Sequence, residues 1–110
     1  MNLYLIRVFN ENEEFFKIGT SVHKYCRFYQ IMKFGYSVEI VLMVYGMTWE
    51  NCLNTEKILQ TNFKQYIPKI KFGGYTECFK NININIYKTL LNNLINEFDY
   101  ITENMLISWR

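Results

Sequence analysis

The spacing of apolar residues changes several times along this chain, and each change suggests the boundary of a secondary-structure element. Residues 3–9 alternate weakly and are rich in β-forming side chains, which is typical of a strand. Residues 15–18 predict a second strand that pairs back on the first as a hairpin and ends at Gly19. Residues 38–45 are strongly apolar and predict a third strand, central in its sheet.

Three helices are predicted between and after these strands. Thr20 or Ser21 can cap a helix that runs to about residue 33 and stops at Gly35, because a hydroxyl accepts hydrogen bonds from the free amides of a first turn. Thr48 can cap a second helix, of which one face carries Leu53, Glu56, Leu59 and Phe63. Residues 83–100 predict a third helix, through the apolar stripe of Ile84, Tyr87, Leu91, Leu94, Ile95 and Phe98.

The order of these elements predicts an α+β fold with a small antiparallel three-stranded sheet flanked by helices. A short extended piece at residues 76–79 follows a loop marked by Pro68 and the pair Gly73-Gly74. No linker or internal repeat divides the 110 residues, so we expect residues 1–110 to form a single domain. The apolar stripe of the last helix is explained more readily as core than as a homodimer surface, which is the alternative.

Composition says more about the cellular compartment of the protein than about its function. Half of the residues are hydrophobic and the net charge is only +2, so nucleic-acid binding would need local clusters of Lys and Arg. The three cysteines fit no zinc-binding spacing and favour a reducing compartment. Residues 1–9 contain Arg7 and do not resemble a signal peptide, and no apolar run reaches the roughly 18 residues of a membrane span. We therefore expect a cytoplasmic protein without a membrane partner.

Charged side chains on two of the predicted helices are candidates for chemistry. His23 and Arg27 lie four residues apart and would share a helix face, and a guanidinium is suited to grip a phosphate. Glu56 on an apolar stripe would need a cation or a metal ion to offset its desolvation. Hydrolysis of a phosphodiester needs activated water and charge neutralisation, which Mg²⁺ supplies with few protein carboxylates. An ordinary ion pair between Arg27 and Glu56 is the simpler alternative.

Five short segments follow one another in an order that resembles the GIY-YIG nuclease family. The segments are Asn2-Leu3-Tyr4, Lys17-Ile18-Gly19, Tyr25-Cys26-Arg27-Phe28, Glu56-x-x-Leu59-x-x-x-Phe63 and Gly74-Tyr75-Thr76-Glu77-Cys78-Phe79. The similarity is to the short phage- and virus-type branch, in which the second tripeptide often reads Lys-Ile-Gly, and it covers residues 2–80. A phage or viral origin would put the protein in the host cytoplasm.

The resemblance implies a divalent-metal-dependent endonuclease that hydrolyses phosphodiester bonds, with DNA as the expected substrate. Tyr4 would activate or orient the attacking water, and Arg27 would stabilise charge on the phosphoryl oxygens. Glu56 would bind one Mg²⁺ or Mn²⁺ ion. Lys17, in place of the family's second tyrosine, would contact phosphate, and His23 would be an additional acid.

The resemblance also implies supporting roles for two further residues. Gly19 would let the backbone turn close to the site. Glu77 would belong to a closing strand, structural or peripheral to the site.

Two departures from the family pattern support an alternative function. Asn2 replaces the glycine of the first motif, and Lys17 replaces the tyrosine of the second. The alternative is a catalytically inactive binding module on the same scaffold, with a nucleic acid, a nucleotide or a protein as its partner.

Overall fold

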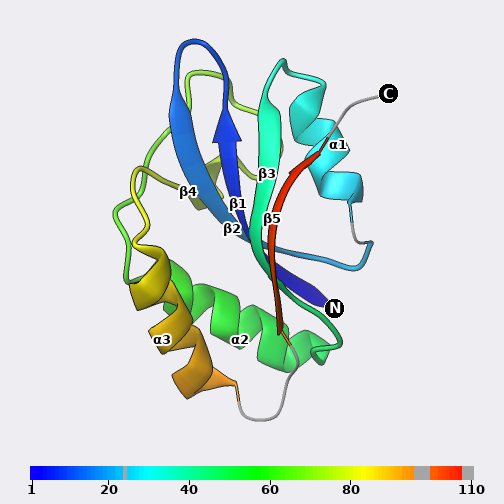
Figure 1. Cartoon of the computed structure of the whole chain (residues 1–110), viewed down its shortest axis with the longest axis vertical. Helices are drawn as coiled ribbons and strands as arrows, with labels where there is room; N and C mark the ends of the chain where they lie inside the picture. The colour runs from blue at the N-terminus through cyan, green and yellow to red at the C-terminus, as the bar shows by residue number, and fades with distance from the viewer. Residues whose placement is uncertain (24, 96–99, 108–110) are drawn as a thin grey trace.

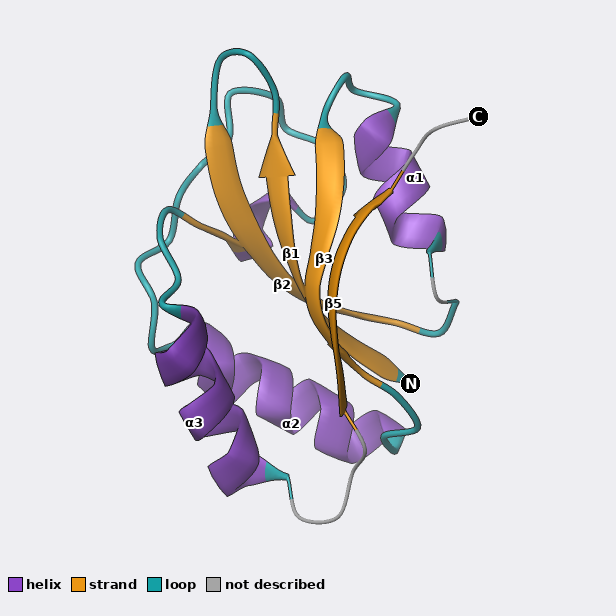
Figure 2. Cartoon of the chain, viewed as in Figure 1, coloured by secondary structure: helices purple, strands orange, loops and turns teal. Residues whose placement is uncertain are grey.

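The computed structural model describes residues 1–23, 25–95 and 100–107 of the chain (Figure 1). In chain order its elements are β1 (Asn2–Phe9), β2 (Glu14–Ser21), α1 (Cys26–Met32), β3 (Ser37–Val44), α2 (Trp49–Gln60), the 3₁₀ turn η1 (Tyr75–Glu77), β4 (Cys78–Phe79), α3 (Ile84–Leu94) and β5 (Tyr100–Ile107). The strands form one antiparallel sheet in the order β4-β2-β1-β3-β5 (Figure 2). The predicted α+β class is confirmed.

The sheet has five strands in the described part of the chain, whereas three were predicted. The additional strands cover its two edges: β4 pairs with Phe16 and Lys17 of β2, and β5 pairs with β3. The predicted helix over residues 83–100 was therefore wrong at its end, because Tyr100 begins β5 and pairs with Val44. The extended piece expected at residues 76–79 is the end of η1 followed by β4, whereas the sequence pattern did not reveal β5, because edge pairing depends on the partner strand more than on local preference.

The start of α1 also differs from the prediction. Thr20 and Ser21 were expected to cap this helix, but they extend β2 and pair with Leu3 and Asn2 of β1. The helix begins at Cys26 without a side-chain cap, so neither hydroxyl acts as predicted. Its end is as expected, since Gly35 follows it with a positive φ of 89°.

The other two helices begin at polar caps. The Thr48 hydroxyl accepts a hydrogen bond from the Asn51 amide at 3.3 Å, which confirms the predicted cap of α2. The Asn83 side chain accepts from the amides of Asn85 and Ile86 at the start of α3. The α3 helix ends at Leu94, and Phe98, which was predicted to belong to its stripe, lies outside the described residues.

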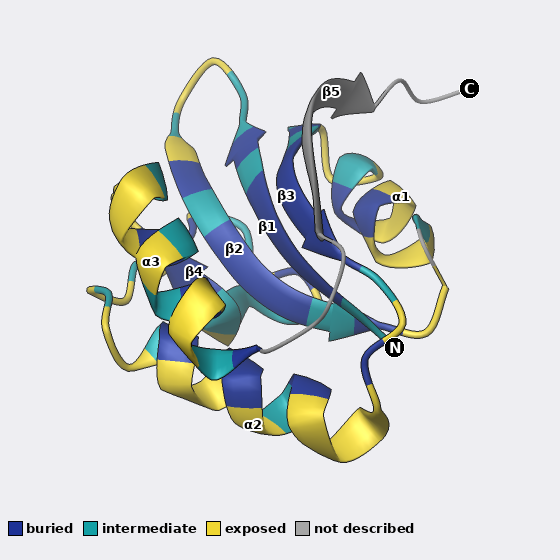
Figure 3. Cartoon of the chain, turned by 60° about the horizontal axis from the view of Figure 1, so that its bottom comes forward, coloured by how far each residue is buried: buried dark blue, intermediate teal, exposed yellow. Residues whose placement is uncertain are grey.

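Alternate residues of β1 build two cores on opposite faces of the sheet. Leu3 and Leu5 belong to the core under α2 and α3, with Cys52, Leu59, Tyr87 and Leu91. Tyr4, Ile6 and Val8 belong to the core under α1, with Phe15, Phe28 and Phe72. Figure 3 shows α2 and α3 together against one face, with α1 apart from them. The apolar stripe of α3 is thus used inside the domain, as the core interpretation expects.

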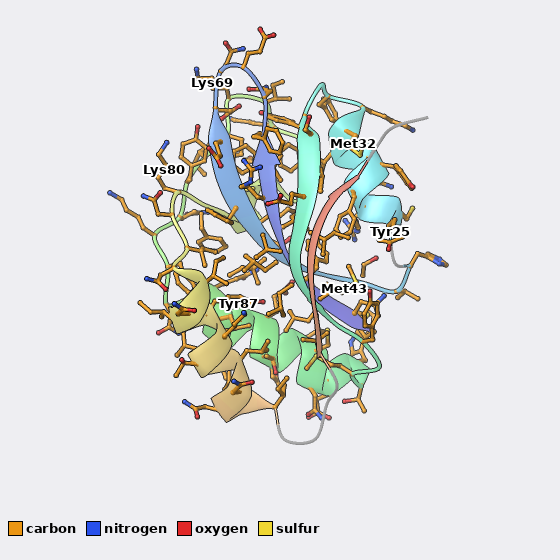
Figure 4. The ribbon with its side chains drawn as sticks, in the orientation of Figure 1. Tyr25, Met32, Met43, Lys69, Lys80 and Tyr87 are labelled. Carbon is orange, nitrogen blue, oxygen red and sulfur yellow. The ribbon has the colours of Figure 1, made fainter. Side chains whose placement is uncertain are left out.

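A carboxylate at the end of the β1–β2 hairpin holds the long loop that leads to β4. Glu13 accepts hydrogen bonds from the hydroxyls of Tyr36 and Tyr66, the latter at 2.6 Å, and from the backbone amide of Lys69 at 3.2 Å. Lys69 and the hairpin lie side by side in Figure 4. Although partial burial opposes it, these hydrogen bonds lower the pKa of Glu13. The loop is therefore anchored on its way to Glu77.

No helix in residues 1–23, 25–95 and 100–107 is both long enough and apolar enough to cross a membrane.

Candidate functional site

The register of the first hairpin brings the two tripeptide motifs together. Tyr4 of β1 lies opposite Gly19 of β2, and Lys17 lies two residues from Gly19 on the same face. The Lys17 ammonium donates a hydrogen bond of 2.9 Å to the Tyr4 hydroxyl oxygen. Both side chains are buried, with 1% of Tyr4 and 3% of Lys17 exposed. A phenol and an ammonium therefore form the floor of a site on the α1 face of the sheet.

Gly19 makes room for that floor. A Cβ atom at this position would lie 2.3 Å from the Tyr4 hydroxyl oxygen and 2.9 Å from Lys17 Nζ, well inside contact distance. The prediction that Gly19 ends β2 and turns the backbone was wrong, because the strand continues to Ser21. The glycine is needed here for close approach of side chains and not for a turn.

Glu77, which was assigned a peripheral role, lies in the site. Its carboxylate forms an ion pair with Lys17, with Nζ and Oε1 3.2 Å apart. Glu77 is the last residue of η1, and Gly74 before it has a positive φ of 84°. A Cβ at Gly74 would lie 3.1 Å from Lys17 Cε, so this turn also passes close to the lysine. The adjacent glycines Gly73 and Gly74 were the feature of the sequence that could have indicated this close turn.

Two residues of α2 complete the cluster from beside β2. Glu56 and Gln60 lie four residues apart, on one face of the helix. The Gln60 amide nitrogen donates to the Ile18 carbonyl at 2.9 Å and reaches Glu77 Oε2 at 3.4 Å. The Ile18 carbonyl is open to this contact because β4 pairs only with Phe16 and Lys17. Gln60 was not among the predicted site residues.

Burial and mutual charge change the pKa values of the ionisable groups in the cluster. Burial, together with the negative charge of Glu77 and a hydrogen bond with it, raises the pKa of the Glu56 carboxyl to about 7 despite the opposing charge of Lys17. Burial alone would lower the pKa of Lys17, but Tyr4 and Glu77 outweigh it and raise that pKa. Near neutral pH the site therefore contains the Lys17 ammonium and a Glu56 carboxyl that is readily protonated or deprotonated.

The remaining predicted residues, Arg27 and His23, lie in a neighbouring depression. His23 precedes α1, so the expectation that it shares a helix face with Arg27 was wrong. Both residues nevertheless line one depression of about 390 Å³, together with Thr20, Ser21, Trp49 and Leu53. Thr20 directly follows Gly19 in β2, and Leu53 precedes Glu56 by three residues in α2. The depression and the buried cluster therefore share two elements, β2 and α2.

The simpler alternative, an ordinary ion pair between Arg27 and Glu56, does not hold: the ion pairs of the described residues involve other partners. Glu56 is instead close to another carboxylate, that of Glu77. Arg27 and Glu56 are thus separate parts of one region, and the simple pairing does not explain them.

Glu56 and Glu77 are the side chains of the cluster that could act as ligands of a hard divalent cation. The described residues contain no group of three or more His, Cys, Asp and Glu side chains that could hold a metal ion. Glu56 and Glu77 together offer carboxylate oxygens, and Mg²⁺ needs few protein ligands because it keeps several of its waters. A cation would also relieve the repulsion that contributes to the raised pKa of Glu56. Burial raises the pKa of the nearby Cys78 thiol to about 12, so Cys78 offers no thiolate near neutral pH.

Comparison of the chain with models of protein families, with characterised proteins and with solved structures finds no match. The fold and the site define a small α+β domain with a buried Tyr–Lys–Glu cluster and, on two of the same elements, a depression whose lining includes Arg27 and Trp49. Its function has to be argued from that chemistry.

Proposed function

We propose that this domain is a divalent-metal-dependent endonuclease of the GIY-YIG type, which hydrolyses phosphodiester bonds in nucleic acid, with DNA as the expected substrate. The observation that supports it is the meeting of Tyr4, Lys17 and Glu56 from three separate elements, two of which also line the depression that contains Arg27. These are four of the residues that the resemblance to the family singled out. A buried ammonium bound to a phenol is also an unusual choice for a purely structural core.

Each side chain has a distinct part in this proposal. Lys17 donates to the Tyr4 hydroxyl oxygen, so the phenol is held in one orientation and its own proton can be directed to water or substrate. Glu56 and Glu77 would hold the Mg²⁺ or Mn²⁺ ion, which supplies Lewis-acid polarisation of a phosphate oxygen and a more acidic bound water. Arg27 would contact phosphate oxygens from the side of the depression.

A second function is favoured by one observation. Lys17 and Glu77 neutralise one another at 3.2 Å, so part of the charge that could act on a substrate is used inside the protein. A catalytically inactive module that binds nucleic acid, a nucleotide or a protein through the depression is the corresponding alternative.

Plasmid nicking distinguishes the two functions. Purified protein is incubated with supercoiled plasmid in Mg²⁺, in Mn²⁺ and in EDTA, beside Glu56→Ala and Arg27→Ala. We expect metal-dependent nicking that Glu56→Ala abolishes and Arg27→Ala slows by about 100-fold, the usual cost of losing one transition-state donor. Glu11→Ala, which changes an exposed glutamate in the hairpin turn, is the matched control and should cleave normally.

Two results would count against the endonuclease. Unchanged cleavage by a folded Glu56→Ala variant would remove Glu56 from the mechanism. No cleavage by the unmodified chain with either metal would favour the binding module.

A further inference from the structure

The depression beside the cluster has an exposed tryptophan that the proposed chemistry does not use. Trp49 is the first residue of α2, and 63% of it is exposed although it is large and apolar. It lines the depression together with Arg27 and His23. In Figures 1 and 3 the first turn of α2 lies on the same side of the molecule as α1. An exposed indole beside a guanidinium suggests a binding surface.

Arg27 is available to a ligand. Among the residues that the structure describes, its guanidinium has neither a hydrogen bond nor an ion pair, in contrast to Arg7, which binds both Glu14 and Glu39. A guanidinium presents five donors in a plane and binds phosphate oxygens in pairs. Phosphate is therefore the chemical group that best suits Arg27.

The size of the depression suits one aromatic group. Its volume of about 390 Å³ lies within the range of small-ligand pockets and is far too small for a double helix. A nucleobase stacks well on an indole, whereas a base inside a duplex has both of its faces covered by its neighbours. The combination of Trp49 and Arg27 thus suits a base that is already unstacked, with its phosphate nearby.

We propose that the depression binds an unstacked base of a single-stranded nucleic acid, with the base on Trp49 and an adjacent phosphate on Arg27. This inference rests on the proposed endonuclease function and specifies its substrate class as single-stranded segments. Thr20 and Leu53 connect the depression to the elements that carry Gly19 and Glu56. A strand seated on Trp49 would then pass over β2 and α2, the elements that carry Gly19 and Glu56.

Fluorescence anisotropy in EDTA tests the binding site without cleavage. Labelled twelve-residue oligothymidylate and oligouridylate, and a twelve-base-pair duplex, are each titrated with the full chain. We expect both single strands to bind more tightly than the duplex, and the two single-stranded probes decide between DNA and RNA. Trp49→Ala should weaken single-strand binding by about 5- to 150-fold, the usual effect of losing one stacking platform, and Trp49→Phe should weaken it less.

Two further variants make the test specific. Ile86→Ala removes another exposed apolar side chain, on α3 and outside the depression, and should bind like the unmodified chain. Arg27→Ala should reduce the dependence of binding on salt by about one phosphate contact. Circular dichroism of each variant verifies that it is folded. Because Trp49 is exposed, its replacement is not expected to unfold the domain.

The outcomes separate this inference from the endonuclease proposal. Equal single-strand affinity of Trp49→Ala and the unmodified chain, equal binding of duplex and single strand, or no binding of any probe would overturn the base site. Binding that depends on Trp49, without cleavage of supercoiled plasmid or of the single-stranded probes in Mg²⁺ or Mn²⁺, would retain the base site and reject the endonuclease. Metal-dependent nicking with no effect of Trp49→Ala on binding would retain the endonuclease and reject the base site.

Discussion

Gly19 offers the sharpest test of the site's geometry, because a single methyl group is added at its centre. In Gly19→Ala the new Cβ would lie 2.3 Å from the Tyr4 hydroxyl oxygen and 2.5 Å from Tyr4 Cζ. Tyr4 has little room to retreat, since it is buried and packs edge-on against Phe28 with ring centroids 4.9 Å apart. Lys17 Nζ, at 2.9 Å from the new atom, is also buried.

We expect Gly19→Ala to lower the free energy of unfolding by about 1–3 kcal/mol, the usual cost of overpacking a filled core. Alanine is intrinsically better than glycine in a strand by about 0.5–1 kcal/mol, so a net loss would come from the steric clash alone. Urea unfolding followed by circular dichroism measures the loss, which corresponds to a midpoint lower by roughly 1 M for a typical urea slope. The variant should also fail to nick plasmid, because Tyr4 can no longer meet Lys17.

Gly73→Ala is the matched control. A Cβ at Gly73 would meet no atom within 4 Å, so this variant should unfold at the same urea concentration as the unmodified chain or slightly above it. The double variant Gly19→Ala/Tyr4→Phe should recover only part of the loss, because the clash with Cζ remains. Equal midpoints for Gly19→Ala and Gly73→Ala would refute the close packing of Tyr4 and Lys17 on Gly19.

Two further predictions concern buried side chains of α2 and α3. The pKa of Glu56, raised to about 7 from an ordinary value of 4.5, means that the folded state binds its proton more tightly than the unfolded state. In EDTA, the free energy of unfolding should therefore fall by up to about 3 kcal/mol between pH 4.5 and 8. Urea unfolding of Glu56→Gln should show no such dependence on pH. An identical pH dependence in the variant would exclude Glu56 as its source. The Tyr87 hydroxyl on α3 (Figure 4) is buried without a hydrogen-bond partner in the part of the chain that the structure describes, so Tyr87→Phe should raise the unfolding free energy by roughly 1 kcal/mol. Tyr66→Phe, which loses a 2.6 Å bond to Glu13, is the comparison and should be less stable than the unmodified chain, and a loss of stability in Tyr87→Phe would indicate a partner for its hydroxyl.

The elements that could be predicted are those whose signals are local. The strands β1 and β3 and the helix α2 follow from hydrophobic period, and the Thr48 cap needs only a hydroxyl before an amphipathic stretch. The elements that could not be predicted depend on distant partners. Residues 20 and 21 continue β2 because β1 is long enough to pair with them, and β5 exists because β3 has an edge to offer.

The candidate site divides in the same way. Tyr4, Lys17 and Glu56 were found from the order of short motifs, and the structure brings them together. Gln60 and Glu77 were not, because the contact of Glu77 with Lys17 spans 60 residues and depends on a loop held by Glu13. Arg27 and His23 were expected on one helix face, and what they share instead is a depression formed by three elements.

The sequence by itself determined which residues carry charge, where the chain alternates and where it must turn, since these follow from side-chain chemistry and backbone preference. It therefore predicted the hairpin and most of the residues that could act on a phosphodiester. Only the tertiary structure decided which charges meet, because burial and the packing of α2 against β2 set the distances among Lys17, Glu56 and Glu77. Burial and the nearby Glu77 raise the pKa of Glu56, and Lys17 joins Tyr4 to Glu77. Neither contact can be read from residues that lie tens of positions apart.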